Sequence, residues 1–177
     1  LNNKNNDKQK ILNKNFNLIF DIKEIYLDKN NITYNLGGSI ILKKDKISEL
    51  NLAAEFLNNK KINFTIKTSD KGEKITTLFS NEAKPLVDRY KFINGFEEGK
   101  LDFYSIKNNE VSKSTLKIYD FKLKEIPTLT KILTLASLQG IADLLSGEGI
   151  RFNDFEMKFS NKDNLMTIDE IYAIGPA

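Results

Sequence analysis

The sequence predicts a mainly β protein with two helices, in which the strands form an antiparallel meander. Apolar and polar residues alternate with a period of two in roughly nine short segments, as expected for strands with one dry and one wet face. Short turns rich in Asn, Asp, Gly and Lys separate these segments. The sequence lacks the regular alternation of strands with long helices that a parallel sheet requires.

The strands are expected in direct succession. The first covers residues 16–27, with a β-bulge after Glu24, where the apolar phase moves by one residue. A polar turn leads to a second strand at 32–42, which a pair of glycines at 37–38 bends. Strands of the same alternation are expected at 50–56, 62–66, 75–79, 101–105, 116–123 (with another phase slip), 155–159 and 165–174.

Two segments interrupt the meander as expected helices. The shorter runs from about Glu82 to Phe92, with Pro85 tolerated in its first turn. The stronger one follows Pro127 and covers about 128–146, and glycines just beyond it end it. Its leucines form two roughly opposite apolar stripes, so this helix needs apolar surroundings on two sides.

The composition argues against most enzyme classes. The chain has 177 residues, 40% of them hydrophobic, which fits one globular body. It has no His and no Cys, and so lacks the commonest metal ligands, the usual general base near neutral pH and the thiol nucleophile. We therefore expect no enzyme activity, no catalytic residue, no metal and no cofactor. An unsuspected carboxylate or lysine site in a polar pocket is the third hypothesis.

The charge pattern gives no reason to expect nucleic acid as a partner. The net charge is +3, and only Arg89 and Arg151 supply the guanidinium forks that phosphates and bases favour. No window reaches the ~20 apolar residues that a membrane-spanning helix needs, so any membrane anchor is expected outside this segment. Residues 1–10 are expected to be a polar lead or linker, and 11–177 one domain cut from a longer chain.

The dry face of such a sheet needs a cover. Nine strands about 4.8 Å apart make a sheet about 40 Å wide, and two helical segments are too small to cover it. The sheet can pair with a second sheet, curl on itself or hold an apolar ligand. The alternation by itself favours the first solution, a closed sandwich, because large exposed apolar surfaces are rare in soluble monomers.

Residues 126–152, IPTLTKILTLASLQGIADLLSGEGIRF, resemble the C-terminal region of the AsmA-like family, YhdP-type branch. The family pattern there is a strand leading into Pro, a Leu-rich helix, a Ser-Leu-x-Gly step, then Leu-Ser-Gly-x-Gly and a Phe that enters the next strand. The Gly-Pro-Ala step at 175–177 also fits it. Upstream, residues 81–101 resemble the family's short helix and strand entry, with one glycine, Gly99, where two are usual. The resemblance covers about 80–177.

The resemblance implies a bent, open, groove-like sheet with an apolar inner face. It further implies the periplasmic part of a protein anchored in the inner membrane of a Gram-negative cell, which moves phospholipid toward the outer membrane. Envelope proteins are possible partners, and the family supplies no catalytic residues. The alternative is a closed β-sandwich that serves protein interaction or outer-membrane assembly and has no lipid groove.

The expected site is the dry face itself, where acyl chains of phospholipids would lie. Its lining residues are expected to be Phe16, Leu18, Phe20, Ile62, Phe64, Ile66, Leu101, Phe103, Leu116, Ile118, Phe155, Met157 and Phe159. The helix at 128–146 is expected to cap one end of this face through Leu129, Ile132, Leu133, Leu135, Leu138 and Leu145.

Overall fold

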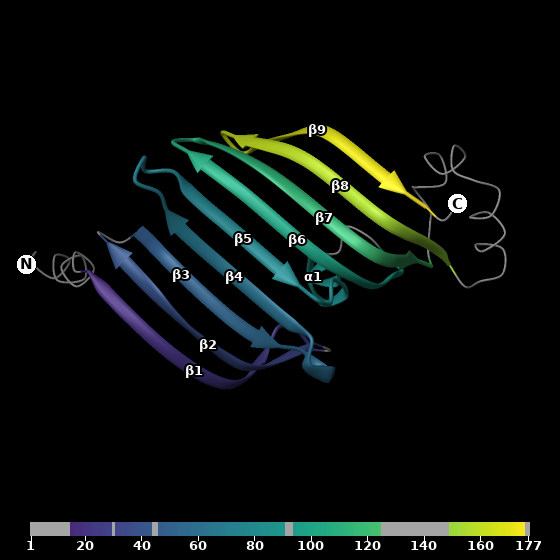
Figure 1. Ribbon diagram of the computed structural model, residues 1–177, viewed down its shortest axis with the longest axis horizontal. Coiled ribbons are helices and arrows are strands. Elements are labelled where there is room, and N and C mark those ends of the chain that lie inside the picture. The colour runs from purple at the N-terminus through teal and green to yellow at the C-terminus, as the bar shows by residue number, and fades with distance from the viewer. Residues whose placement is uncertain (1–14, 30, 44–45, 91–93, 125–148, 176–177) are drawn as a thin grey trace, which may run out of the picture.

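The computed structural model describes residues 15–29, 31–43, 46–90, 94–124 and 149–175. These residues form one nine-stranded sheet, in which each strand pairs antiparallel with the strands that precede and follow it in the chain (Figure 1). The sheet is open, because its two edge strands do not pair with each other. The antiparallel meander predicted from the sequence is confirmed, and the described residues contain no second sheet that would make a closed sandwich.

Seven of the nine observed strands are longer than the segments expected from the sequence alternation, whereas β1 is one residue shorter and β9 has the expected bounds. Their bounds are β1 (Phe16–Tyr26), β2 (Ile32–Lys43), β3 (Lys46–Glu55), β4 (Lys61–Thr68), β5 (Lys74–Ser80), β6 (Phe96–Asn108), β7 (Val111–Leu123), β8 (Ile150–Lys162) and β9 (Leu165–Ile174). A 3-10 turn, η1 (Leu57–Asn59), joins β3 to β4, and one α-helix, α1 (Lys84–Tyr90), lies between β5 and β6. The stronger helix expected at 128–146 lies outside the described residues.

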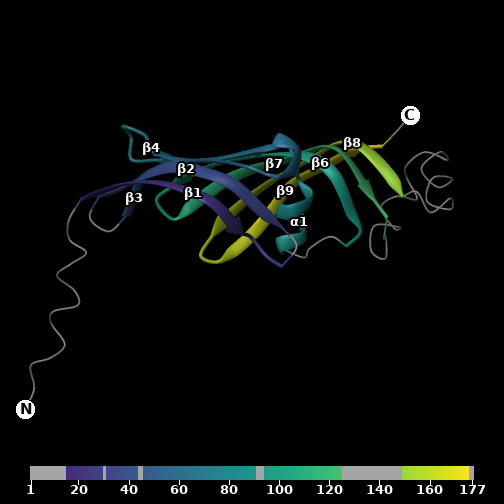
Figure 2. The same ribbon diagram turned by 90° about the horizontal axis from the view of Figure 1, so that it is seen from below.

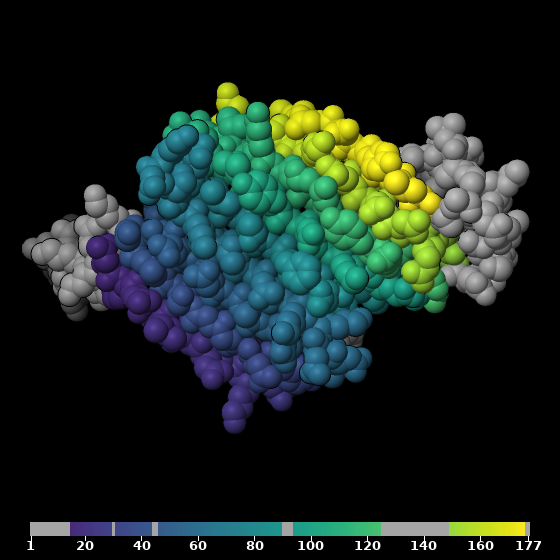
Figure 3. All heavy atoms as spheres, viewed as in Figure 1, coloured from purple at the N-terminus to yellow at the C-terminus, as the bar shows by residue number. Residues whose placement is uncertain are grey.

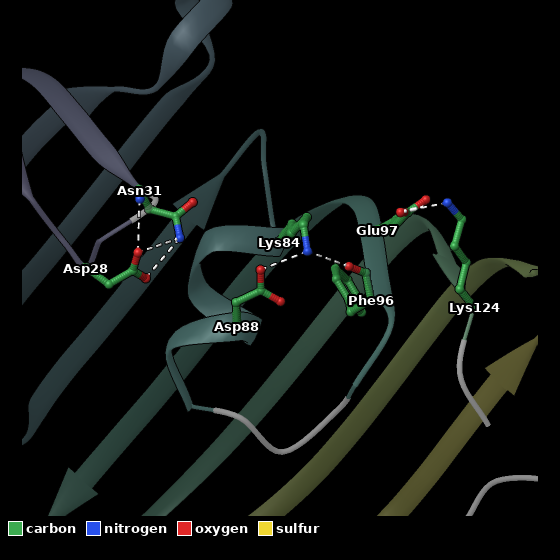
Figure 4. Close-up of polar contacts among 7 residues, drawn as sticks. All are labelled: Asp28, Asn31, Lys84, Asp88, Phe96, Glu97 and Lys124. Carbon is green, nitrogen blue, oxygen red and sulfur yellow. Dashed lines mark hydrogen bonds and ion pairs between the residues drawn. The ribbon is translucent and has the colours of Figure 1, made fainter. Parts of the chain in front are cut away.

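Polar side chains stabilise the first turn of the meander. The backbone amide of Asn31 donates to the Asp28 carboxylate at 2.9 Å, and the Asn31 side-chain amide donates to the same carboxylate at 2.9 and 3.0 Å (Figure 4). Asp at the start of a turn commonly accepts such bonds from residues further along. The turn between β1 and β2 therefore forms where the polar run was expected.

Helix α1 begins two residues after the expected Glu82, with Pro85 in its first turn as predicted. The Ser80 hydroxyl bonds to the backbone of Glu82 rather than capping the helix, and the carbonyl of Ala83 accepts the first helical hydrogen bonds. The Lys84 ammonium donates to Asp88 at 2.8 Å and to the carbonyl of Phe96 at 3.0 Å, which ties the helix to β6 (Figure 4).

The main core lies between α1 and one face of the sheet, which we call the apolar face (Figure 2). Val87 of the helix and Phe96 of β6 are fully buried in it. Phe121 stacks between Phe96 and Phe152, with ring centroids 5.2 and 5.1 Å apart. The buried members of the core are Ala83, Val87, Phe96, Leu101, Ile118, Phe121, Leu123, Ile150 and Phe152.

In three strands, β6, β7 and β8, a local break in the alternation of side chains keeps the apolar residues on one face. In β7, Ile118 and Phe121 are three residues apart, yet both lie in the core, because Asp120 between them has φ 52° and no register partner. Gly99 of β6 and Asn153 of β8 lie opposite Asp120 and likewise have no register partner. A similar interruption opposes Lys23 to Asn35, which has φ 52°. The alternation therefore breaks within 16–27 and 116–123 as predicted, but the prediction of a β-bulge after Glu24 was wrong, because β1 and β2 keep the same register on both sides of the break. The register shifts lie in the pairings of β2 with β3 and of β8 with β9.

Substitution of Gly99 shows whether the break in alternation requires a glycine at this position. Its φ is +83°, and an added Cβ would lie 3.0 Å from the Cβ of Phe121. Gly72 has a similar φ of +79° but has open space around it. We expect Gly72→Ala to lower the free energy of unfolding by about 1 kcal/mol through backbone strain, and Gly99→Ala by about 2–3 kcal/mol. Urea denaturation followed by circular dichroism measures both, and equal losses would contradict the steric role of Gly99.

Candidate functional site: the apolar face of the sheet

The strand register places all thirteen predicted lining residues on the apolar face. Cross-strand partners share a face, and so do residues two apart along a strand. One row runs through Ile62, Ser80, Leu101, Ile118 and Phe155. The next runs through Phe20, Gly38, Leu52, Phe64, Leu78, Phe103, Leu116 and Met157, and the third through Leu18, Ile40, Leu50, Ile66, Thr76, Ser105, Ser114 and Phe159. Phe16 precedes Leu18 by two residues on β1.

Coverage of this face is uneven. Under α1, Leu101 is 6% exposed and Ile118 is 1% exposed. Away from the helix, Phe64, Phe103 and the other predicted lining residues are half-buried, and Phe16 and Leu18 on the edge strand are exposed. The helix therefore covers one end of the apolar face, and the face extends well beyond it.

Several residues of this face were missing from the prediction, although the same alternation contains them. On β9, Met166, Ile168 and Ile171 pair with Asn161, Phe159 and Met157 and so belong to the apolar face. Every residue of β9 is exposed. Leu50, Leu52 and Leu78 fill the face in the middle of the sheet. The period of two identifies all of them once the register of the neighbouring strand is known.

One glycine shows how closely the strands pack at this face. Gly38 of β2 lies opposite Phe20 and Leu52, and an added Cβ there would collide with the backbone carbonyl of Asn51. It would also lie 3.0 Å from the Leu52 side chain. The expected bend at 37–38 thus coincides with a position that excludes larger side chains.

The opposite face, the polar face, carries a ladder of ion pairs. Lys117 lies 3.0 Å from Glu156, and Lys158 bridges Glu156 at 3.5 Å and Glu170 at 2.7 Å. The hydrogen bond from Lys117, together with the charges of Lys117 and Lys158, holds the pKa of Glu156 below its ordinary value despite some loss of hydration. The hydrogen bond to Glu170, followed by the charges of Glu170 and Glu156, raises the pKa of Lys158.

Figure 3 shows the described strands as one continuous surface from β1 to β9. A hollow of about 1110 Å³ is lined by polar-face residues of β6, β7 and β8, among them Tyr104, Thr115 and Lys158. A smaller one involves Asp102, Lys117 and Tyr119. Most of the residues that line both hollows belong to the polar face, but Phe159 also lines the larger hollow and Phe103 the smaller one.

The described residues contain no group of three or more acidic side chains that could hold a metal ion. Within the same ranges, no helix is long and apolar enough to cross a membrane. The six expected end-cap residues at 129–145, five leucines and Ile132, lie outside the described part of the chain.

Comparison with known proteins gave no relative for this chain. No protein-family model, no curated protein and no solved structure matches it.

The polar-face ladder predicts an acid-sensitive contribution to stability. Because the pKa of Glu156 is lowered on folding, its contribution is present above the unfolded pKa of 4.5 and is lost as the pH falls through the lower folded value. Glu156→Gln should reduce the urea midpoint at pH 7, and the difference from the natural protein should close in acid. Glu24→Gln, on a carboxylate without an ion pair in the described residues, is the control and should show no such closing gap.

Proposed function

We propose that this chain binds acyl chains along its apolar face and serves as a lipid-binding segment of a bridge-like protein that transfers phospholipid between two membranes. The single observation that carries the proposal is the extent of the apolar face. It runs through all nine strands, and α1 covers only one end of it. An acyl chain laid on such a face gains about 0.8 kcal/mol for each buried CH₂.

The mechanism requires no chemistry from the protein. The face is lined by aliphatic and aromatic side chains, so it holds a chain by contact area without fixing its position along the strand. A lipid can therefore slide while its head group stays in water at the rim. Passive transfer of this kind fits a chain without His or Cys.

The resemblance of residues 80–177 to the AsmA-like family supplies the cellular setting of the proposal. On this resemblance we propose that the segment lies in the periplasm, tethered by an anchor elsewhere in the protein, and that phospholipid moves between the inner and outer membrane. The alternative is that another protein covers the same apolar face in an envelope-assembly complex. The exposed apolar residues of β9 favour this second candidate, because uncapped edge strands readily pair with other chains.

Paired phenylalanine variants test the lipid-binding proposal. Phe64 lies on the apolar face of β4, whereas Phe79 of the paired strand β5 lies on the polar face and is 40% exposed. We expect Phe64→Ser to weaken binding of the neutral fluorescent probe N-phenyl-1-naphthylamine by about tenfold, since part of a phenyl contact worth 1.5–3 kcal/mol is lost. Phe79→Ser should leave the affinity unchanged.

Native mass spectrometry of the purified chain provides an independent measurement. Phospholipid should remain bound to the natural protein and to Phe79→Ser, and should be depleted from Phe64→Ser. A protein that carries no lipid and binds no apolar probe would overturn the proposal. Formation of a defined complex that blocks the probe would favour the protein-interaction alternative.

A further inference from the structure

The apolar face ends in a row of polar residues, which crosses β4 to β8 at the strand ends farthest from α1. Beyond the row of Ile66, Thr76 and Ser105, the next residues on the same face are Thr68, Lys74, Lys107, Ser112 and Asn161, which pair successively across β4 to β8. The polar character begins one row earlier, where Ser114 donates to Ser105 at 2.9 Å. The face therefore changes from apolar to hydrogen-bonding along the strand direction.

Two lysines stand opposite each other in this row. Lys74 and Lys107 are direct register partners, which places their Cβ atoms roughly 5 Å apart. Like charges in this position destabilise a sheet. Neither ammonium group makes an ion pair with any carboxylate of the described residues.

The nearest acidic side chains in sequence are Glu73 and Glu110, in the turns beside the two lysines. Both line the larger hollow, and neither forms an ion pair with Lys74 or Lys107. On the apolar face, the neighbours of the lysine pair are the hydroxyl groups of Thr68 and Ser112. The Thr68 hydroxyl already donates to the carbonyl of Ser48 at 2.9 Å, so the pair combines two cations with one neutral donor, the Ser112 hydroxyl, which is a favourable setting for an anion.

We infer that Lys74 and Lys107 hold the anionic head group of an amphiphile whose acyl chain lies on the apolar face and points toward α1. This inference rests on the proposed function and adds to it the charge of the ligand and its direction. From Lys107 to Leu101 the strand spans about 20 Å, and one lipid leaflet has a hydrocarbon depth of about 15 Å. The apolar rows are therefore long enough to take an acyl chain while its head group contacts the lysines.

The chain offers a matched control for this site. Lys43 and Lys46 are also direct register partners at the same end of the sheet. The register of β2 and β3 shifts by one residue between Ile41 and Leu42, so Ile47 pairs with Leu42 of the apolar face. Lys43 and Lys46 lie next to these two residues, so their side chains belong to the polar face. The double variants K74Q/K107Q and K43Q/K46Q remove the same charge from the two faces.

The experiment measures displacement of N-phenyl-1-naphthylamine by two ligands with the same chain, dodecyl phosphate and dodecylphosphocholine, below their micelle-forming concentrations. We expect the natural protein and K43Q/K46Q to prefer the anionic dodecyl phosphate by about tenfold, equivalent to about 1.4 kcal/mol. K74Q/K107Q should lose this preference and keep its affinity for dodecylphosphocholine. Inorganic phosphate alone should displace no probe and should compete only weakly with dodecyl phosphate.

The outcomes separate this inference from the proposed function. An unchanged preference in K74Q/K107Q, or equal loss in both double variants, would overturn the head-group site and leave acyl-chain binding intact. Inorganic phosphate that competes as strongly as dodecyl phosphate would show an oxyanion site unrelated to lipid. Failure of both dodecyl ligands to bind the natural protein would overturn the proposed function and this inference together.

Discussion

The fold depends on one constraint: nine successive strands must present their apolar side chains on the same face. A period of two achieves this only while the backbone alternates without error, and a single extra residue would move every later side chain to the other face. In β6, β7 and β8 the alternation breaks at Gly99, Asp120 and Asn153, which fall at the same level without a change of register, so the three strands change phase together. Phe121 and Phe152 remain in the core for this reason.

The helix α1 depends on the same phase. Val87 is fully buried only because Phe96, Leu101 and Ile118 point toward it from adjacent strands. The helix has seven residues, too short to be stable alone, so the sheet holds it rather than the reverse. Lys84 adds a polar tie to the carbonyl of Phe96 at the rim of that core. Helix and sheet thus form one unit at this end, and the rest of the face has no such support in the described residues.

The sequence was sufficient to predict the meander, the one-sided alternation and the shared face of the thirteen expected lining residues. Those predictions use local periodicity, which each strand carries within itself. The sequence left open whether the sheet closes, because closure depends on how distant surfaces meet. It also did not indicate that Lys74 faces Lys107, since strand register depends on turn geometry. The polar row at the end of the apolar face became visible only through that register.

The simple strand order has a consequence for folding. Each strand pairs only with the strands beside it in the chain, so every pairing joins consecutive segments. Loop closure then costs little entropy, and sheets of this topology fold rapidly for their strand content. The buried aromatic cluster of β6 to β8 is the natural nucleus, from which strands can add one at a time toward the poorly buried β1. Unfolding should begin at the edges, with amide exchange fastest at β1 and β9 and slowest around Phe121.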